Sequence, residues 1–139
     1  MEQRVYIYVH GDNLSDPALL ASGPRAHVRY AGSTEDGFPA KEALDAIPGD
    51  EGKRVRARML AFAQRFADFG KLPGTHGHRL SQPFADIYEF KPCDYRVMAF
   101  RVGMIWYVTN VAKKASPKVQ NRDYQIAENM RLSFSEGSK

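Results

Sequence analysis

The sequence has little cysteine, no long apolar run and no internal repeat. Its single cysteine, Cys93, cannot form a disulfide within the chain, which is typical of proteins from a reducing compartment. No stretch approaches the roughly 20 consecutive apolar residues of a membrane-spanning helix. The first residues also lack the cationic start and long apolar core of a signal peptide. We therefore expect a cytoplasmic protein with no membrane partner.

Basic residues are abundant, and they are concentrated in the second part of the chain. Residues 1–52 contain 4 Lys and Arg against 9 Asp and Glu, whereas residues 53–139 contain 16 against 7. The net charge of +4 for the whole chain conceals this division. A concentrated positive charge favours a polyanionic partner such as RNA, because neutralising phosphates releases bound counterions. A solvated helix surface would give the same count, so charge alone leaves both interpretations open.

Hydrophobic periodicity predicts helices before and after a group of strands. Strands are expected at residues 5–9 and 27–30, followed by a short helix at 39–47 and a longer one at about 53–69. Three further strands are expected at residues 85–91, 95–102 and 104–112, and a last helix runs from Lys118 or Asn121 to Phe134. The short links between the three later strands predict hairpins. We expect an α+β fold in which the helices, two N-terminal and one C-terminal, pack on one face of an antiparallel sheet.

The longer helix is expected to turn one apolar stripe toward the core. Its members recur at spacings of four, three, four and three residues: Val55, Met59, Phe62, Phe66 and Phe69. Gly70 follows directly and is a natural C-terminal stop. In the last helix, a similar stripe consists of Tyr124, Ala127, Met130 and Phe134.

Strand alternation separates the candidate functional side chains from the core. Tyr88 and Phe90 should point to one face of the sheet and Glu89 and Lys91 to the other. If the helices cover one face, charged residues such as Lys91 and Arg101 should mark the open one. Cations for phosphate contacts then follow near the last strand end: Lys113, Lys114, Lys118 and Arg122. Rings such as those of Tyr88 and Tyr124 could stack on an unpaired base, although most aromatic residues of the strands are expected in the core.

The order of these segments resembles the RelE/HigB toxins of toxin–antitoxin systems, and in particular the phage-derived Gp49-like branch. The resemblance rests on four runs in sequence, namely Asp86–Lys91, Asp94–Phe100, Val108–Lys114 and Tyr124–Ala127. It extends over residues 27–134, so we expect a toxin-like domain over residues 27–139. Residues 1–26 fall outside it as an N-terminal extension that could add a strand.

The resemblance implies a metal-independent endoribonuclease, an mRNA interferase that needs no cofactor. Its mRNA substrate is often held in the ribosome, and a cognate antitoxin protein is its usual partner. The 2′-hydroxyl of RNA is an internal nucleophile, so the protein needs only to position it, remove its proton and stabilise the charge that develops. By position in the motifs, Arg96 and Lys114 would hold the scissile phosphate with help from Lys91 and Lys113. Tyr124 would orient the nucleophile or stack a base.

The identity of the general base stays open at this stage. A lysine base needs a strongly lowered pKa, which crowded cations could supply by repulsion. Glu89 stands where RelE itself has a lysine-rich strand, and as a carboxylate it is a second candidate base. The alternative for Glu89 is a surface ion pair with Lys91 or Arg101.

The histidines of the loop before the later strands are weaker candidates. His76 and His78 are within reach of one site, but no further Cys or His cluster completes a tetrahedral metal set. A proton-donating loop histidine is a second interpretation, and the neighbouring Arg79 is expected to contribute charge to RNA binding, as are Arg101, Lys118 and Arg122.

Two rival functions use the same residues differently. A ParE-like toxin of the same fold would block DNA gyrase by binding, and a regulatory module would bind RNA without cutting it. An inhibitor needs no converging phosphate site, so a cluster of Arg96, Lys114 and Tyr124 favours the nuclease. An antitoxin could cover the basic helix surface around Arg54, Arg58 and Arg65 through an acidic or amphipathic segment.

Overall fold

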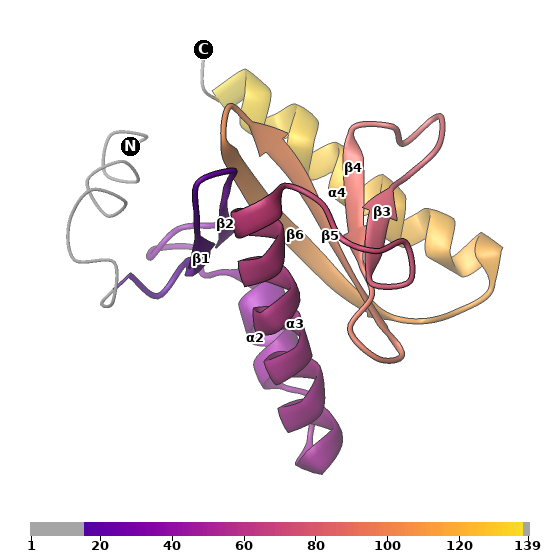
Figure 1. Cartoon of the computed structure of the whole chain (residues 1–139). Helices are drawn as coiled ribbons and strands as arrows, with labels where there is room; N and C mark the ends of the chain where they lie inside the picture. Colours follow the sequence, from indigo (N-terminus) through magenta and orange to yellow (C-terminus); the bar gives the residue numbers. More distant parts are fainter. Residues whose placement is uncertain (1–15, 138–139) are drawn as a thin grey trace.

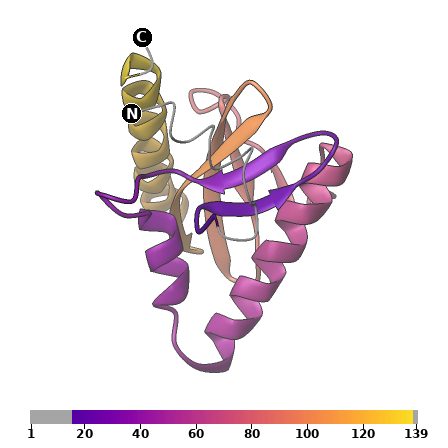
Figure 2. The same cartoon turned by 90° about the vertical axis from the view of Figure 1, so that its left-hand side faces the viewer.

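The computed structural model describes residues 16–137, in which one sheet is covered by helices on both faces (Figures 1 and 2). The predicted strand at residues 5–9 lies outside the described residues. The strands are β1 (Leu19–Ser22), β2 (His27–Tyr30), β3 (Gly77–Arg79), β4 (Ile87–Phe90), β5 (Tyr95–Val102) and β6 (Ile105–Lys113). The helices are α2 (Pro39–Asp45), α3 (Gly49–Phe69) and α4 (Pro117–Gly137). Within that range, no helix combines the length and apolar character needed to cross a bilayer.

The sheet is mixed, so the expected antiparallel sheet is only partly correct. Its strand order is β1-β2-β6-β5-β4-β3. The strands from β3 to β6 form an antiparallel meander. The sequence predicted its last three strands, because the links of four and two residues between β4, β5 and β6 can join only antiparallel neighbours. The short strand β3 was not predicted. β2 instead pairs parallel with β6, with Val28 opposite Trp106. The chain reaches this position through α2, α3 and the meander, which together form a long crossover of the kind that parallel pairing requires.

β1 is an edge strand of the same sheet. It pairs antiparallel with β2, with Ser22 opposite His27. Residues 19–22 belong to the predicted N-terminal extension, residues 1–26, and they add a strand to the sheet. Two described strands therefore precede the helices, and of these the sequence predicted β2 at residues 27–30 but not β1.

The helices cover both faces of the sheet, whereas the sequence predicted one covered face (Figure 2). α2 and α3 pack on one face against residues such as Phe90, Val97 and Val108. α4 packs on the other face against Ile87, Met98 and Phe100. Because strand residues alternate between faces, successive residues of β4 and β5 belong to two different core clusters. We call these the α3 face and the α4 face.

α3 begins and ends for identifiable reasons. It starts at Gly49, four residues before the predicted start, and carries Asp50 and Glu51 in its first turn, where negative charge stabilises the helix dipole. It ends at Gly70, which adopts a left-handed conformation with φ 79°, as predicted. The predicted stripe is buried from Val55 to Phe66. The exception is Phe69, which is 62% exposed.

α4 presents its predicted apolar stripe to the sheet. Ala127 is fully buried, and Tyr124, Met130 and Phe134 pack around it. The Phe134 ring lies 4.7 Å from the ring of Tyr107 on β6. Tyr124 lies in the N-terminal half of α4, where it reaches Glu89 of β4.

Candidate functional site

Glu89 is a buried carboxylate at the centre of the candidate site. It lies in the middle of β4, opposite His78 on β3 and Met98 on β5, and is 3% exposed. The hydroxyl of Tyr124 donates a hydrogen bond of 2.7 Å to its Oε2 atom. A buried carboxylate is costly unless it is hydrogen-bonded or paired with a charge. Tyr124 therefore satisfies one oxygen of Glu89, and the other oxygen faces His78.

A bulge in β6 helps to fix Tyr124 above the sheet. The register places Asn110 opposite Met98 but Val108 opposite Ala99, so it skips Thr109. Bulges re-aim side chains, and Nδ2 of Asn110 donates a hydrogen bond of 3.1 Å to the backbone oxygen of Asp123. This contact ties the second turn of α4 to β6, one residue before Tyr124.

His78 is the second titratable group of the site. Its Nε2 atom lies 4.0 Å from Oε1 of Glu89, and its side chain is 43% exposed. Burial lowers the pKa of His78 below its ordinary value of 6.5, and the charges of Lys91 and Arg96 lower it further against the opposing effect of Glu89. The imidazole is therefore mostly neutral near pH 7, with one nitrogen as donor and the other as acceptor.

Two cations complete the cluster. Arg96, at the start of β5, donates hydrogen bonds from Nη1 to the backbone oxygens of Tyr95 at 2.8 Å and Cys93 at 3.2 Å. Lys91 follows β4 directly, and both cations act on the pKa of His78. We call His78, Glu89, Lys91, Arg96 and Tyr124 the Glu89 cluster.

The hydroxyl of Tyr124 is a hydrogen-bond donor and stays protonated. Burial raises its pKa above the ordinary value of 10.0, the hydrogen bond to Glu89 and the charge of that carboxylate raise it further, and Arg96 opposes the rise. Tyr124 can therefore orient a carboxylate or a substrate oxygen. It is unsuited to accept a proton at neutral pH.

Lys114 lies at the same end of the sheet as Arg96 but just outside the cluster. Ala112 pairs with Arg96, and Lys114 comes two residues later, with its backbone N–H bonded to the oxygen of Asp94 at 2.7 Å. Its side chain is exposed. A phosphate bound over Arg96 would therefore lie within the range of a flexible lysine side chain.

The structure places several other predicted residues away from the cluster. Lys113 lies over the ring of Tyr95, which packs on the α3 face. Arg101 lies over Trp106 near the far end of β5. Arg79 pairs with Tyr88 on β3 and β4. These cations are not brought together with Glu89.

Three further candidate residues lie either in the core or on the exposed surface of α4. Tyr88 is 8% exposed and packs against Phe66 of α3, so its ring is not available to stack on a base. Lys118 and Arg122 are exposed in the first two turns of α4. They remain accessible to a polyanion near Tyr124.

The two loop histidines do not share a site. His76 stacks on Phe62 of α3 with ring centroids 4.6 Å apart, whereas His78 faces Glu89 on the α4 face. Across residues 16–137, no group of three His, Cys, Asp or Glu side chains is arranged to hold a metal ion. The pairing of His78 with Glu89 was not predicted, because β3 has only three residues and is too short to show a strand pattern in the sequence.

Neither the protein-family models nor the curated protein sequences contain a match to this chain.

Proposed function

We propose that the protein is an endoribonuclease that cleaves RNA through its own 2′-hydroxyl and acts as the toxin of a type II toxin–antitoxin system. One observation carries the proposal. The buried carboxylate of Glu89 is held by Tyr124 and faces His78, whose pKa is lowered by the charges of Lys91 and Arg96. A proton acceptor next to two cations is what attack by a hydroxyl on a phosphodiester requires.

In the proposed reaction, Glu89 accepts the proton of the 2′-hydroxyl as the O2′–P bond forms. Arg96 and Lys91 stabilise the negative charge on the phosphorane oxygens, and Lys114 approaches from the same end of the sheet. The P–O5′ bond then breaks, and the leaving oxygen takes a proton from the protonated fraction of His78. The products are a 2′,3′-cyclic phosphate and a 5′-hydroxyl. Glu89 replaces lysine as the base, which removes the need for a strongly lowered lysine pKa.

The biological setting of the proposal comes from the resemblance to RelE/HigB toxins. It makes mRNA in the ribosome the substrate, a cognate antitoxin the partner and the cytoplasm the location. The exposed basic residues of α3, including Arg54, Arg58 and Arg65, lie on the helix that covers the α3 face. An antitoxin segment bound there would leave the α4 face with its Glu89 cluster free, so inhibition would require a second contact at the cluster.

The test is cleavage of a defined mRNA by purified protein, with and without translating ribosomes. We expect 5′-hydroxyl ends, and a loss of at least about tenfold for Arg96→Gln and Lys91→Gln because each removes stabilising charge. Glu89→Gln should lose about 10²- to 10⁴-fold, the usual contribution of a general base. Arg58→Gln, an exposed cation on the opposite face, is the control and should cleave like the parent protein.

The rival functions give different results in the same preparation. Intact RNA together with inhibited DNA supercoiling by gyrase would replace the nuclease proposal with a ParE-like one. Intact RNA, normal supercoiling and retained RNA binding would identify a non-catalytic module. Cleavage that is equally fast in Glu89→Gln and in the parent would remove Glu89 from the mechanism.

A further inference from the structure

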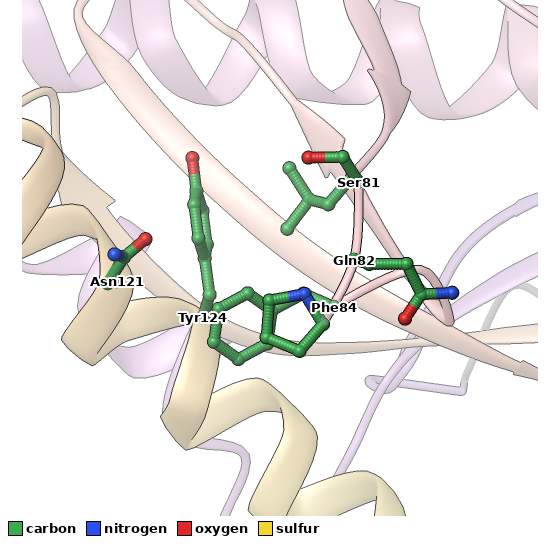
Figure 3. A pocket seen from close by; sticks show the side chains of 7 residues that line it. Ser81, Gln82, Phe84, Asn121 and Tyr124 are labelled. Carbon is green, nitrogen blue, oxygen red and sulfur yellow. The ribbon is translucent and has the colours of Figure 1, made fainter.

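A cavity of about 310 Å³ lies beside the Glu89 cluster, between the loop that precedes β4 and the first turns of α4. Phe84 and Tyr124 contribute rings to it, and Ser81, Gln82 and Asn121 contribute polar groups (Figure 3). Tyr124 therefore belongs both to this cavity and to the Glu89 cluster. Whatever occupies the cavity lies directly next to the proposed reaction site.

The loop that forms one wall is held in place by its own hydrogen bonds. The N–H of Phe84 donates to the oxygen of Ser81 at 2.9 Å, and the N–H of Ile87 donates to the oxygen of Phe84 at 3.0 Å. The ring of Phe84 packs on the ring of Tyr124 at 5.7 Å with an interplanar angle of 62°. The two walls thus meet through an aromatic contact.

The chemistry of the walls suits a flat, neutral, hydrogen-bonding ligand. Aromatic rings accept a planar base by stacking, and the amides of Gln82 and Asn121 each offer donors and an acceptor for a base edge. None of the residues that line the cavity is Lys or Arg. The cations lie instead in the neighbouring Glu89 cluster, so phosphate and base would occupy adjacent places.

We propose that this cavity binds one unstacked RNA base next to the scissile phosphate, and that Gln82 and Asn121 determine which base is preferred. The proposal rests on the proposed function for the identity of the ligand as RNA. The base adjacent to the reacting phosphate would enter between Phe84 and the polar rim, while the ribose and phosphate reach Glu89 and Arg96. Cleavage would then depend on the identity of that base.

Binding without cleavage tests the cavity separately from the reaction. The probes are fluorescein-labelled 2′-O-methyl RNA hexamers that differ only in one central base, because methylation blocks the 2′-oxygen as nucleophile. Fluorescence anisotropy should give dissociation constants that differ at least fivefold between the best and the worst base. Gln82→Ala and Asn121→Ala should reduce this ratio to below twofold. Phe84→Leu, which keeps an apolar side chain but removes the ring, should weaken binding of all four hexamers.

Gln125→Ala and Asn129→Ala are matched controls, because these exposed amides lie on α4 and bond to each other instead of lining the cavity. Both should keep the fivefold ratio, and thermal melting should show that every variant is folded. A ratio that is the same in the parent, Gln82→Ala and Asn121→Ala overturns the base pocket even if RNA is cleaved. A preference that depends on Gln82 and Asn121, in a protein that cleaves nothing, supports the pocket and rejects the nuclease.

Discussion

The hydroxyl of Tyr124 on α4 and the carboxylate of Glu89 on β4 are joined by a hydrogen bond of 2.7 Å. Glu89 is 3% exposed and lies between the sheet and the helix. The bond therefore serves two purposes: it satisfies a carboxylate that burial would otherwise penalise, and it fixes the orientation of the proposed base. Stability and activity should consequently respond together when it is removed.

Tyr124→Phe tests this relationship because it keeps the ring and removes only the hydroxyl. The variant leaves a buried acceptor without its partner, which costs about 1–3 kcal/mol in the free energy of unfolding. Urea denaturation measures this loss. RNA cleavage should fall through kcat more than through KM, because the base is misplaced while the other binding groups remain.

Tyr95→Phe, on the α3 face, is the control. Tyr95 packs below Lys113, away from Glu89, and its variant should keep both stability and cleavage within about 0.5 kcal/mol of the parent, as is usual for changes away from special contacts. Equal stability of Tyr124→Phe and the parent protein would show that the bond contributes nothing.

Local sequence signals predicted the last three strands of the meander and the opposite orientations of Tyr88 and Glu89, but not the complete sheet or its second covered face. The expectation that Lys91 and Arg101 mark one open face is wrong, because Arg101 lies over Trp106 on the α3 face, whereas Lys91 acts on His78 on the α4 face. The links between β4, β5 and β6 are short, and side-chain alternation correctly separated Tyr88 from Glu89. The parallel pairing of β2 with β6 joins segments far apart in the chain, and no local pattern encodes it. One signal for the second covered face was present, since Val97 to Phe100 form an unbroken apolar run, which is typical of a strand buried on both faces.

The site shows the same division between local and distant information. The alternation of side chains along β4 correctly predicted that Glu89 and Tyr88 lie on opposite faces. The apolar stripe of α4 correctly predicted that Tyr124 faces the sheet. His78 was not predicted beside Glu89, because β3 has only three residues and its register depends on pairing with β4. The Phe84–Tyr124 contact likewise joins a loop to a distant helix. Tertiary packing, not local pattern, assembles these pairs.

His78 should make stability depend on pH in the weakly acidic range. Its pKa in the folded protein is lowered first by burial, then by Lys91 and Arg96, with Glu89 opposing. The unfolded chain therefore binds a proton more readily than the folded protein, and the stability that neutral His78 contributes is lost as pH falls below about 6.5. Above that range the contribution is complete.

Urea unfolding of the parent and of His78→Gln at a series of pH values measures this effect. Between about pH 7.5 and pH 5, the parent should lose more unfolding free energy than the variant. Shifted carboxylates such as Asp123 are present in both proteins and cancel in the comparison. Parallel pH profiles for the two proteins would show that His78 titrates normally.

Gly52→Ala should destabilise the protein, although alanine favours a helix interior by about 1 kcal/mol. A Cβ atom at position 52 would collide with the backbone oxygen of Ile47 and lie 2.8 Å from Nη1 of Arg56. That Arg56 nitrogen bonds the oxygens of Leu44 at 2.7 Å and Ile47 at 3.2 Å, so it cannot move away without loss. The expected cost is about 1–3 kcal/mol, as for other overpacked positions.

Thermal melting measures this cost, and Gly74→Ala provides the control. A Cβ atom at position 74 would have no neighbour within 4 Å, so the control should melt within a few degrees of the parent. A Gly52→Ala protein that melts higher than the parent would mean that helix propensity outweighs the collision, and that the turn between α2 and α3 adapts easily.

Asp16→Ala should be the most destabilising of these substitutions. Oδ2 of Asp16 lies 3.1 Å from Nη1 of Arg29, and both side chains are almost fully buried. Removing the carboxylate leaves the guanidinium buried without its counter-charge, which costs about 3–5 kcal/mol. It also removes the acceptor of the Ala18 N–H, so the start of β1 should loosen. Urea denaturation measures the loss.

Two comparisons make this prediction specific to the buried pair. Lys41→Ala breaks the exposed pair with Asp45 and should cost less than about 1 kcal/mol, because solvent screens surface ion pairs. The double variant Asp16→Ala with Arg29→Met removes both charges, so it should be more stable than Asp16→Ala alone. A double variant that is less stable than Asp16→Ala would show that Arg29 stabilises the sheet through its packing, independently of Asp16.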